Sequence, residues 1–426
     1  MINVAAEAAT HKAHFARRLA PIDIVILMTL IVVARVSRRG VFLVIGKKNL
    51  ASEEASYKAK KFTNWISFGN LSVATAIFGG SVKRAYLVNL ILLMSFAFSA
   101  RAGAQDAPSN DEFAPLVLVR IIPMPDVEGR FDHLAVDNRS GRVFASVYGN
   151  DSVQVLDVQR GKRIHILTDP GFSRPQMVAY IPESNRIVVS NEGDGSCRIF
   201  DADTYKPIDT VKYSEDADQL RYDPVSKRIF VGYGDEAEGA IGMFDAVTNK
   251  RLGDFVVGAH PESFQLEEKG PRIFVNLASI NQIAVIDRNT HKVDKWKLEG
   301  AGTNFPMALD EAHRRMFVAA RRPARLLVLD MDTGKTIASL PGAADTDDMW
   351  YDSDRKRIYI PSGEGFIFVY QQIDADRYER IAKIPTAIGA RTSAYYGQVG
   401  KHNTLYVAVP ARANRGAELW FYETRD

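Results

Sequence analysis

Residues 219–256 read QLRYDPVSKRIFVGYGDEAEGAIGMFDAVTNKRLGDFV, a stretch in which four short apolar runs alternate with turn-forming residues. Each run has the usual length of a strand, about four to eight residues. Asp, Asn and Gly stand at the breaks, where they favour tight turns. The stretch therefore predicts four consecutive strands. It lacks the apolar stripes of period 3.6 and the good helix formers that helical repeats need.

The same pattern recurs along the chain at a nearly constant interval. Further copies, the last of them weaker, cover residues 134–167, 177–211, 263–298, 307–340, 349–384 and 393–423. In the seven copies, the first apolar residue of the second run is Val143, Ile187, Ile229, Ile273, Met316, Ile358 and Leu405. The intervals between successive members of this series are 44, 42, 44, 43, 42 and 47 residues. Four strands in a repeat of about 40 to 50 residues form one blade of a β-propeller. We therefore predict an all-β fold, a seven-bladed β-propeller of four-stranded blades.

The last copy is incomplete, because it ends near Tyr422 after its third run. Residues 116–122, LVLVRII, precede the first complete copy and belong to no copy of their own. We expect this N-terminal strand to complete the last blade and close the ring. Closure removes open strand edges, which are sites of aggregation.

Composition and charge limit the classes of function. The chain has 426 residues, 46% of them hydrophobic and 25% charged, which excludes a disordered or collagen-like chain. Residues 1–104 contain 14 Lys and Arg and 4 Asp and Glu, which gives a net charge of +10. Residues 105–426 contain the other 40 basic and 47 acidic residues, which gives a net charge of −7. An acidic domain argues against nucleic acid as the partner, since phosphate contacts need clustered Lys and Arg. The single cysteine excludes a disulfide framework within the chain and a Cys-rich zinc site.

Residues 83–104, KRAYLVNLILLMSFAFSARAGA, have the pattern of a secretory signal peptide. They consist of a basic start, an apolar run and an ending of small residues. We interpret residues 82–104 as a signal peptide cleaved after Ala104. Residues 105–426 would then be a periplasmic or secreted propeller domain, monomeric and without a membrane attachment. Residues 1–81 are interpreted as a spurious or unstructured extension, with translation starting at Val82. An uncleaved signal anchor behind a cytoplasmic extension is the alternative.

Several copies share a finer motif. Residues 175–180 read PQMVAY, residues 272–276 read RIFVN, and the third runs SVQVLD and IAVID end in aspartate. That aspartate recurs as Asp157, Asp201, Asp245, Asp287 and Asp330. These features resemble the YVTN-type repeat of the bacterial YncE-like β-propeller family, over residues 116–423. The resemblance implies the propeller fold. The family includes lactonase-like relatives beside proteins without an assigned activity, so it does not imply one function.

The loops that enter the innermost strands of a propeller lie together at one mouth of its central channel. Alignment of the copies places Asp132, Gln176, Asp218, Glu262, Phe305 and Asp347 at one such loop position. Converging carboxylates with imidazoles suit Ca²⁺ or another divalent metal. The candidate metal ligands are Asp132, His133, Asp218, Glu262, Asp347 and Asp348. The candidates for a ligand site at the channel mouth are Arg130, Arg174, Gln176, Asp216, His260, Phe305 and Asp345.

Three functions fit this pattern. The first is a binding or interaction scaffold without catalysis, whose protein or small-molecule ligand sits at the channel mouth. The second is a metal-dependent, lactonase-like hydrolase, which needs a metal and a general acid or base in one pocket. The third is a docking surface for a periplasmic redox partner. The same Asp and His residues also fit a structural role, in which they cap turns and hold neighbouring blades together.

Overall fold

The computed structural model describes residues 30–37, 40–47, 64–68, 71–75, 114–235, 237–399, 402–413 and 415–426. The chain divides into two compact units, Met1–Ser99 and Ala100–Asp426. The strands of the first unit are β1 (Leu30–Ser37), β2 (Gly40–Lys47), β3 (Asn64–Phe68) and β4 (Leu71–Thr75), in the sheet order β1-β2-β4-β3. They fall within residues 1–81, whose interpretation as an extension stays a prediction. The predicted signal peptide, residues 82–104, lies outside the described residues.

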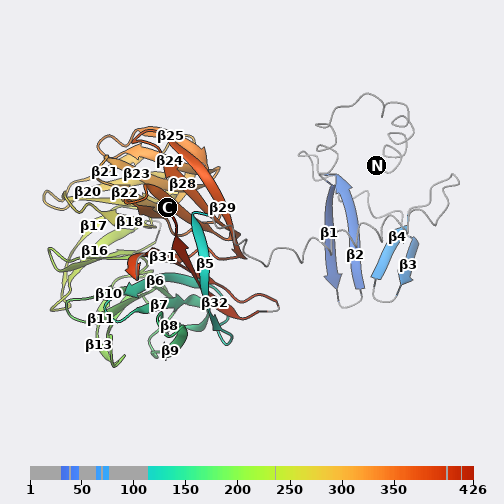
Figure 1. Cartoon of the computed structure of the whole chain (residues 1–426), viewed down its shortest axis with the longest axis horizontal. Coiled ribbons are helices and arrows are strands. Elements are labelled where there is room, and N and C mark those ends of the chain that lie inside the picture. The colour runs from blue at the N-terminus through green and yellow to red at the C-terminus, as the bar shows by residue number, and fades with distance from the viewer. Residues whose placement is uncertain are drawn as a thin grey trace. The chain divides into compact units, whose positions relative to one another are not determined.

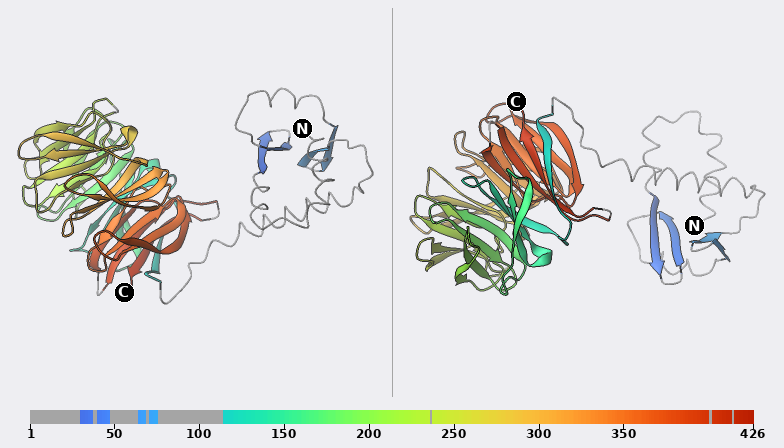
Figure 2. Two further views of the ribbon diagram at one scale, coloured as in Figure 1. Left: turned by 90° about the horizontal axis from the view of Figure 1, so that it is seen from above. Right: turned by 60° about the horizontal axis from the view of Figure 1, so that its bottom comes forward.

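The described part of the second unit forms seven four-stranded antiparallel sheets that stand around a common axis (Figures 1 and 2). The first three are β6 (Phe131–Asp137), β7 (Arg142–Val147), β8 (Ser152–Asp157) and β9 (Lys162–Leu167); β10 (Pro175–Ile181), β11 (Arg186–Asn191), β12 (Ser196–Asp201) and β13 (Pro207–Lys212); and β14 (Leu220–Asp223), β15 (Arg228–Tyr233), β16 (Ala240–Asp245) and β17 (Arg251–Val256). The next three are β18 (Phe264–Leu266), β19 (Arg272–Leu277), β20 (Gln282–Asp287) and β21 (Val293–Lys297); β22 (Gly302–Asp310), β23 (Arg315–Arg322), β24 (Ala324–Asp330) and β25 (Thr336–Pro341); and β26 (Trp350–Asp352), β27 (Arg357–Ser362), β28 (Glu364–Gln372) and β29 (Tyr378–Ile388). The predicted all-β class and the seven four-stranded blades are confirmed.

The seventh sheet combines strands from both ends of the propeller unit. It contains β30 (Ser393–Val399), β31 (His402–Val409), β32 (Ala417–Thr424) and β5 (Leu116–Met124). β5 pairs antiparallel with β32, with Ile122 opposite Leu419 and Met124 opposite Ala417. The described helices in this unit are the short 3-10 turns η2 (Tyr148–Asn150) and η3 (Ala278–Ile280). None of the chain's described helices has the length and apolar character needed to span a membrane.

Burial explains the pattern of apolar and polar residues along the strands. The second strand of the first blade, β7, is RVFASV, and all six residues are buried. The outer strand β9 instead alternates exposed and half-buried residues along KRIHI. Middle strands lack a polar face because neighbouring blades cover both of their sides. The hydrophobic clusters accordingly lie between blades, as where Phe144 and Val155 pack with Val189 and Phe200 of the next blade.

Arginine side chains connect each blade to the next, and we call these contacts the arginine latches. At five interfaces an arginine at the start of a second strand donates to a backbone carbonyl after the third strand of the following blade: Arg142 to Ala202, Arg186 to Ala246, Arg272 to Met331, Arg315 to Ala375 and Arg357 to Arg425. Arg288 bonds Asp223 between blades 3 and 4 at 3.2 Å, and Arg120 bonds the Gln159 carbonyl between blades 7 and 1 at 3.2 Å. The latches lie at turns opposite the loops that enter the first strands.

Candidate functional site

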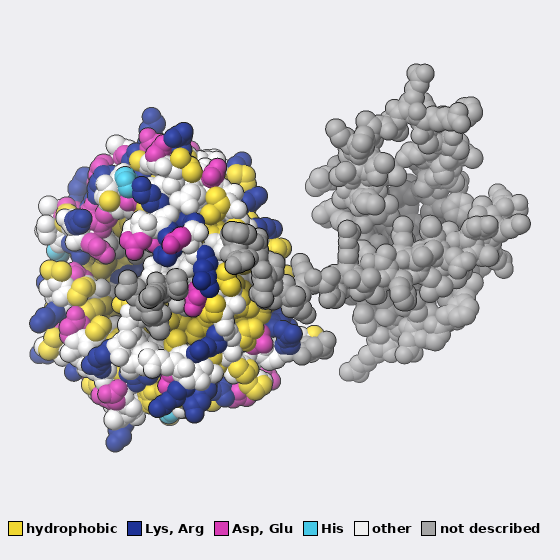
Figure 3. Space-filling model, viewed as in Figure 1, with side chains coloured by type: hydrophobic (Ala, Val, Ile, Leu, Met, Phe, Trp, Pro, Cys, Tyr) yellow, Lys and Arg dark blue, Asp and Glu magenta, His cyan; other side chains and the backbone are white. Residues whose placement is uncertain are grey.

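A cavity of about 730 Å³ opens at the end of the propeller where loops enter the first strands. Loops that join second to third strands reach the same end and complete its wall. Seven carboxylates line it, from Asp132, Glu192, Asp216, Asp218, Asp235, Glu262 and Asp347, against the single arginine Arg130. Two histidines, His133 and His260, also line it, so carboxylates outnumber basic side chains seven to three. A concave surface with an excess of one sign of charge concentrates counter-ions, so this cavity favours cations. On the face seen in Figure 3, basic and acidic side chains are interspersed.

Some carboxylates at the mouth are neutralised by arginines of the chain itself. These pairs are Asp132 with Arg130, Glu192 with Arg174, Asp345 with Arg391, and Asp347 with both Arg321 and Arg391. Two of the arginines also stack on aromatic rings. Arg130 lies 4.0 Å from the ring centroid of Tyr148, and Arg321 lies 3.3 Å from that of Phe305. The Arg130 and Arg321 side chains are therefore held in place, and their carboxylate partners are committed to internal contacts.

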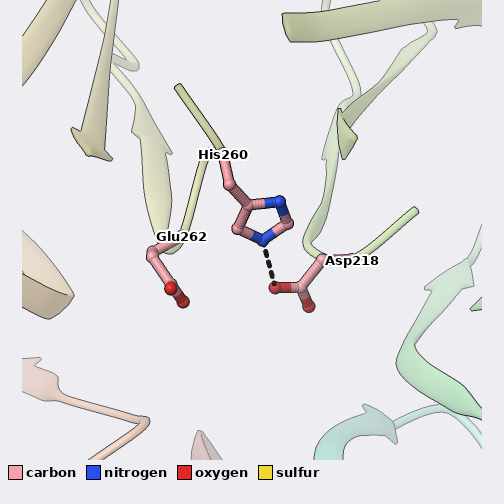
Figure 4. Close-up of side chains that lie close together, drawn as sticks. All are labelled: Asp218, His260 and Glu262. Atoms are coloured by element: carbon pink, nitrogen blue, oxygen red, sulfur yellow. Dashed lines mark ion pairs between the residues drawn. The ribbon is translucent and has the colours of Figure 1, made fainter. Parts of the chain in front are cut away.

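The wall formed by blades 3 and 4 has a different composition. Asp218, His260 and Glu262 each place one potential ligand atom within 4.8 Å of the others (Figure 4). His260 Nδ1 donates to the Gly234 carbonyl at 2.6 Å, and its Nε2 lies 3.8 Å from Asp218 Oδ2. Asp218 Oδ1 is buried without a hydrogen-bond partner among the described residues. The nearest further carboxylate, Asp216, lies 3.5 Å from His260 Nδ1.

The repeat geometry places these side chains. Asp218 and Glu262 stand just before the first strands β14 and β18. The Asp218 amide donates to the Gly232 carbonyl at 2.8 Å, and the Glu262 amide donates to the Asn276 carbonyl at 3.0 Å. These bonds continue the pairing of first and second strands into the loop. Equivalent side chains of neighbouring blades therefore project into the same cavity.

His133 forms a second polar network, which crosses the channel between blades. Its Nδ1 lies 3.0 Å from Asp348 Oδ1, and the Gln219 carboxamide contacts its Nε2. Asp348 also accepts from the Ser393 amide at 2.6 Å. The network thus joins blade 1 to blades 3, 6 and 7. Both ring nitrogens of His133 already have protein partners, which makes His133 a structural bridge.

Burial and mutual proximity shift the pKa values of the groups in the cavity. Burial is the main cause that raises the pKa of Asp132 to about 7, of Glu262 to about 8 and of Asp216 to about 6. Burial opposes the charged form of the two histidines, but facing carboxylates outweigh it. Asp348 and Asp132 raise the pKa of His133 to about 10, and Asp218 and Asp216 raise that of His260 to about 10. The site therefore holds protons tightly when no other cation is present.

Ten of the thirteen residues predicted at the mouth line this one cavity, and the exceptions are Arg174, Asp345 and Asp348. The predicted set of six metal ligands does not converge as a whole. Of that set, Asp218 and Glu262 approach a common imidazole, that of His260, in the described ranges. Asp132 and Asp347 pair with arginines, while His133 and Asp348 pair with each other.

Sequence reasoning missed six residues of the cavity wall: Tyr148, Glu192, Gln219, Asp235, Ser263 and Ser279. Four of them, Tyr148, Glu192, Asp235 and Ser279, lie in loops between second and third strands. In an antiparallel blade these loops lie at the same end as the loops that enter the first strand. Aligning the loops between second and third strands as well would therefore have identified these four residues.

No protein-family model and no curated protein sequence matches the chain. Solved structures do resemble it. Hydrazine synthase of Kuenenia stuttgartiensis is 16% identical, with a TM-score of 0.55 over 72% of this chain and 95% of that one. A chain of the mitotic checkpoint complex is 13% identical, with a TM-score of 0.61 over 75% of this chain and 95% of that one. The WD40 repeats of RRP9 are 11% identical, with a TM-score of 0.59 over 75% of this chain and 99% of that one. At these identities the likeness shows the fold, a seven-bladed β-propeller of WD40-like architecture.

Proposed function

We propose that this protein is an exported β-propeller of the YVTN type that binds a partner through a positively charged group at the acidic channel mouth. The group would be an ammonium or guanidinium, carried by a partner protein or a small molecule. The observation that carries the proposal is the excess of seven carboxylates over one arginine in one cavity of about 730 Å³. Catalysis is not needed for this role.

The shape and chemistry of the mouth support binding of a cationic group. The cavity is open on one side, and Asp235 at its rim is exposed. Asp235 has no arginine partner among the described residues and accepts only from the backbone amides of Ala237 and Glu238, so it offers negative charge to an incoming cation. Charged side chains at such a rim steer association and set specificity. Export to the periplasm or beyond is part of the proposal and rests on the signal-peptide pattern of residues 82–104.

A second candidate function, the metal-dependent hydrolase, is favoured by the convergence of Asp218, His260 and Glu262. The redox docking function has no comparable feature of the described residues in its favour. Binding at the mouth remains the function that the cavity supports best, because it uses the whole charged wall.

The proposal is tested by titrating the purified protein with a tetra-lysine peptide and, as a control ligand, a tetra-glutamate peptide. We expect tetra-lysine to bind with an affinity that falls as salt rises, and tetra-glutamate not to bind. The double variant Glu192→Gln with Asp235→Asn removes two charges from the rim. Because charges at a protein surface contribute about 0.2–1 kcal/mol each, its affinity should fall about two- to thirtyfold.

The matched control is Asp294→Asn with Glu379→Gln, which removes the same charge from the outer strands β21 and β29. This control should bind tetra-lysine as the wild type does. Equal weakening in the two double variants would show a nonspecific charge effect and contradict the proposed site.

A further inference from the structure

On the wall of blades 3 and 4, no arginine of the described residues forms an ion pair with Asp218 or Glu262. Asp218 is buried, with its side chain 9% exposed, and its Oδ1 atom has no hydrogen-bond partner. Glu262 makes no side-chain hydrogen bond or ion pair within the described ranges, although it faces Asp218 across the same space (Figure 4). A buried acceptor without a donor lowers stability, and more so when it is charged. A bound cation would remove this cost.

The orientation of His260 suits a metal ion in particular. Its Nδ1–H donates to the Gly234 carbonyl at 2.6 Å, which leaves Nε2 as the nitrogen that faces Asp218. Metal-binding histidines usually donate their other ring N–H to a carbonyl or carboxylate, which fixes the ring and its tautomer. A metal ion that displaced the proton of Nε2 would find the Nε2 lone pair and Asp218 Oδ2 on the same side of the ring, 3.8 Å apart.

We infer that Asp218, His260 and Glu262 form a binding site for a divalent transition-metal ion, Zn²⁺ being the best fit. One imidazole and two carboxylates are a three-ligand set that leaves a fourth position free, as in zinc sites that bind water or substrate. All three residues line the cavity. Ca²⁺ fits less well, because it prefers six to eight oxygen ligands. Affinity for such a mixed set should follow Zn²⁺ above Mn²⁺, with Ca²⁺ weakest.

The three side chains require a small adjustment to bind the ion. Ligand atoms about 2.1 Å from a tetrahedral Zn²⁺ lie about 3.4 Å apart, so groups now up to 4.8 Å apart must close by about 1 Å. Glu262 can supply most of this movement, because its carboxylate has no other partner in the described residues. His260 and Asp218 are held by the Gly234 bond and by burial, and provide the fixed part of the site.

The metal site shares a cavity with the proposed binding function but uses different carboxylates. Peptide binding was assigned to the rim residues Glu192 and Asp235, whereas metal binding depends on the wall residues Asp218 and Glu262. The inference rests on the proposed function only in that both put a cation in this cavity. Either can fail while the other holds, since each has its own variant and its own probe.

The test is a titration of the purified, chelator-treated protein with Zn²⁺, Mn²⁺ and Ca²⁺ against a chromophoric metal indicator. We expect one Zn²⁺ per chain, bound at least about tenfold more tightly than Ca²⁺. Glu262→Gln should weaken Zn²⁺ binding at least about tenfold, because it replaces a charged ligand by a neutral one. X-ray absorption of the Zn²⁺ form should show one histidine nitrogen and oxygen ligands.

Glu192→Gln is the matched control, since it makes the same chemical change in the same cavity outside the three ligands. It should keep wild-type Zn²⁺ affinity. Thermal denaturation of both variants in chelator checks that they are folded. Unchanged Zn²⁺ affinity in Glu262→Gln, or an equal loss in Glu192→Gln, would overturn the inference.

Discussion

Replacing Arg142 by alanine tests whether the arginine latches hold the blades together. Arg142 is 8% exposed and bonds Asp137, whose side chain is fully buried, at 2.8 Å. It also donates to the Ala202 carbonyl of the next blade. The variant would leave a buried carboxylate without its counter-charge and a carbonyl without its donor. We therefore expect a large loss in the free energy of unfolding.

The contacts of Asp137 set the size of that loss. Removal of one partner from a buried ion pair typically costs about 3–5 kcal/mol. Asp137 would keep bonds from the Ser140 hydroxyl and from the Arg139 amide, the latter at 3.0 Å. These bonds place the expected loss near the lower end, at about 3 kcal/mol. Burial tends to raise the pKa of Asp137, but Ser140 and Arg142 outweigh it and hold that pKa below its ordinary value. The loss should thus shrink in acid, as Asp137 becomes protonated.

Blade 3 provides the control, because Arg228 occupies the equivalent position but is exposed. Urea denaturation followed by tryptophan fluorescence would compare the two variants with the wild type. Arg228→Ala should change the free energy of unfolding by less than about 0.5 kcal/mol. The reasoning fails if Arg142→Ala costs less than about 1 kcal/mol, or if both variants cost the same.

Three other predictions concern the channel, the seventh sheet and export. The pKa of His133 lies at about 10 because of Asp348 and Asp132, so its stabilisation is complete below its unfolded pKa of about 6.5. That stabilisation is lost as pH rises through about 10. The urea midpoint of the wild type should therefore fall over this pH range, and the fall should be smaller in the His133→Gln variant. Deletion of β5 (Leu116–Met124) should expose the edge of β32 and give aggregates in size-exclusion chromatography. Mass spectrometry of the exported protein should find cleavage after Ala104, and any peptide from the preceding extension would contradict it.

The sequence was enough to predict the propeller, because its signals are local and repeated. A middle strand such as RIFVGY, residues 228–233, is apolar at successive positions since blades cover both of its faces. Turns rich in Asp, Asn and Gly mark each break, and the interval between copies hardly changes. One ambiguous run would not distinguish a strand from a buried helix segment, whereas seven aligned copies do.

The candidate site was predictable as a location and not as a set of contacts. Loop alignment placed ten of the thirteen candidate residues at one cavity, since position in a repeat determines position around the axis. It could not tell which carboxylates would meet arginines, because Arg321 lies at the end of the second strand β23 and Arg391 lies in the loop that enters β30 of the seventh blade. It also could not show that His133 reaches across to Asp348 and Gln219. Such pairings depend on side-chain rotamers, which strand periodicity does not determine.

The two ends of the propeller use charge differently. At the latch end, each latch arginine finds its acceptors within the protein, as Arg272 does with Glu267 at 2.9 Å and with the Met331 carbonyl at 2.7 Å. At the mouth, carboxylates outnumber arginines, and Asp218 retains an unpaired oxygen. Internal pairing at one end stabilises the ring without help, so the other end can keep unsatisfied charge. Unsatisfied buried charge lowers stability, which makes it an improbable feature of a purely structural surface and a reasonable one for a surface whose cation arrives from outside.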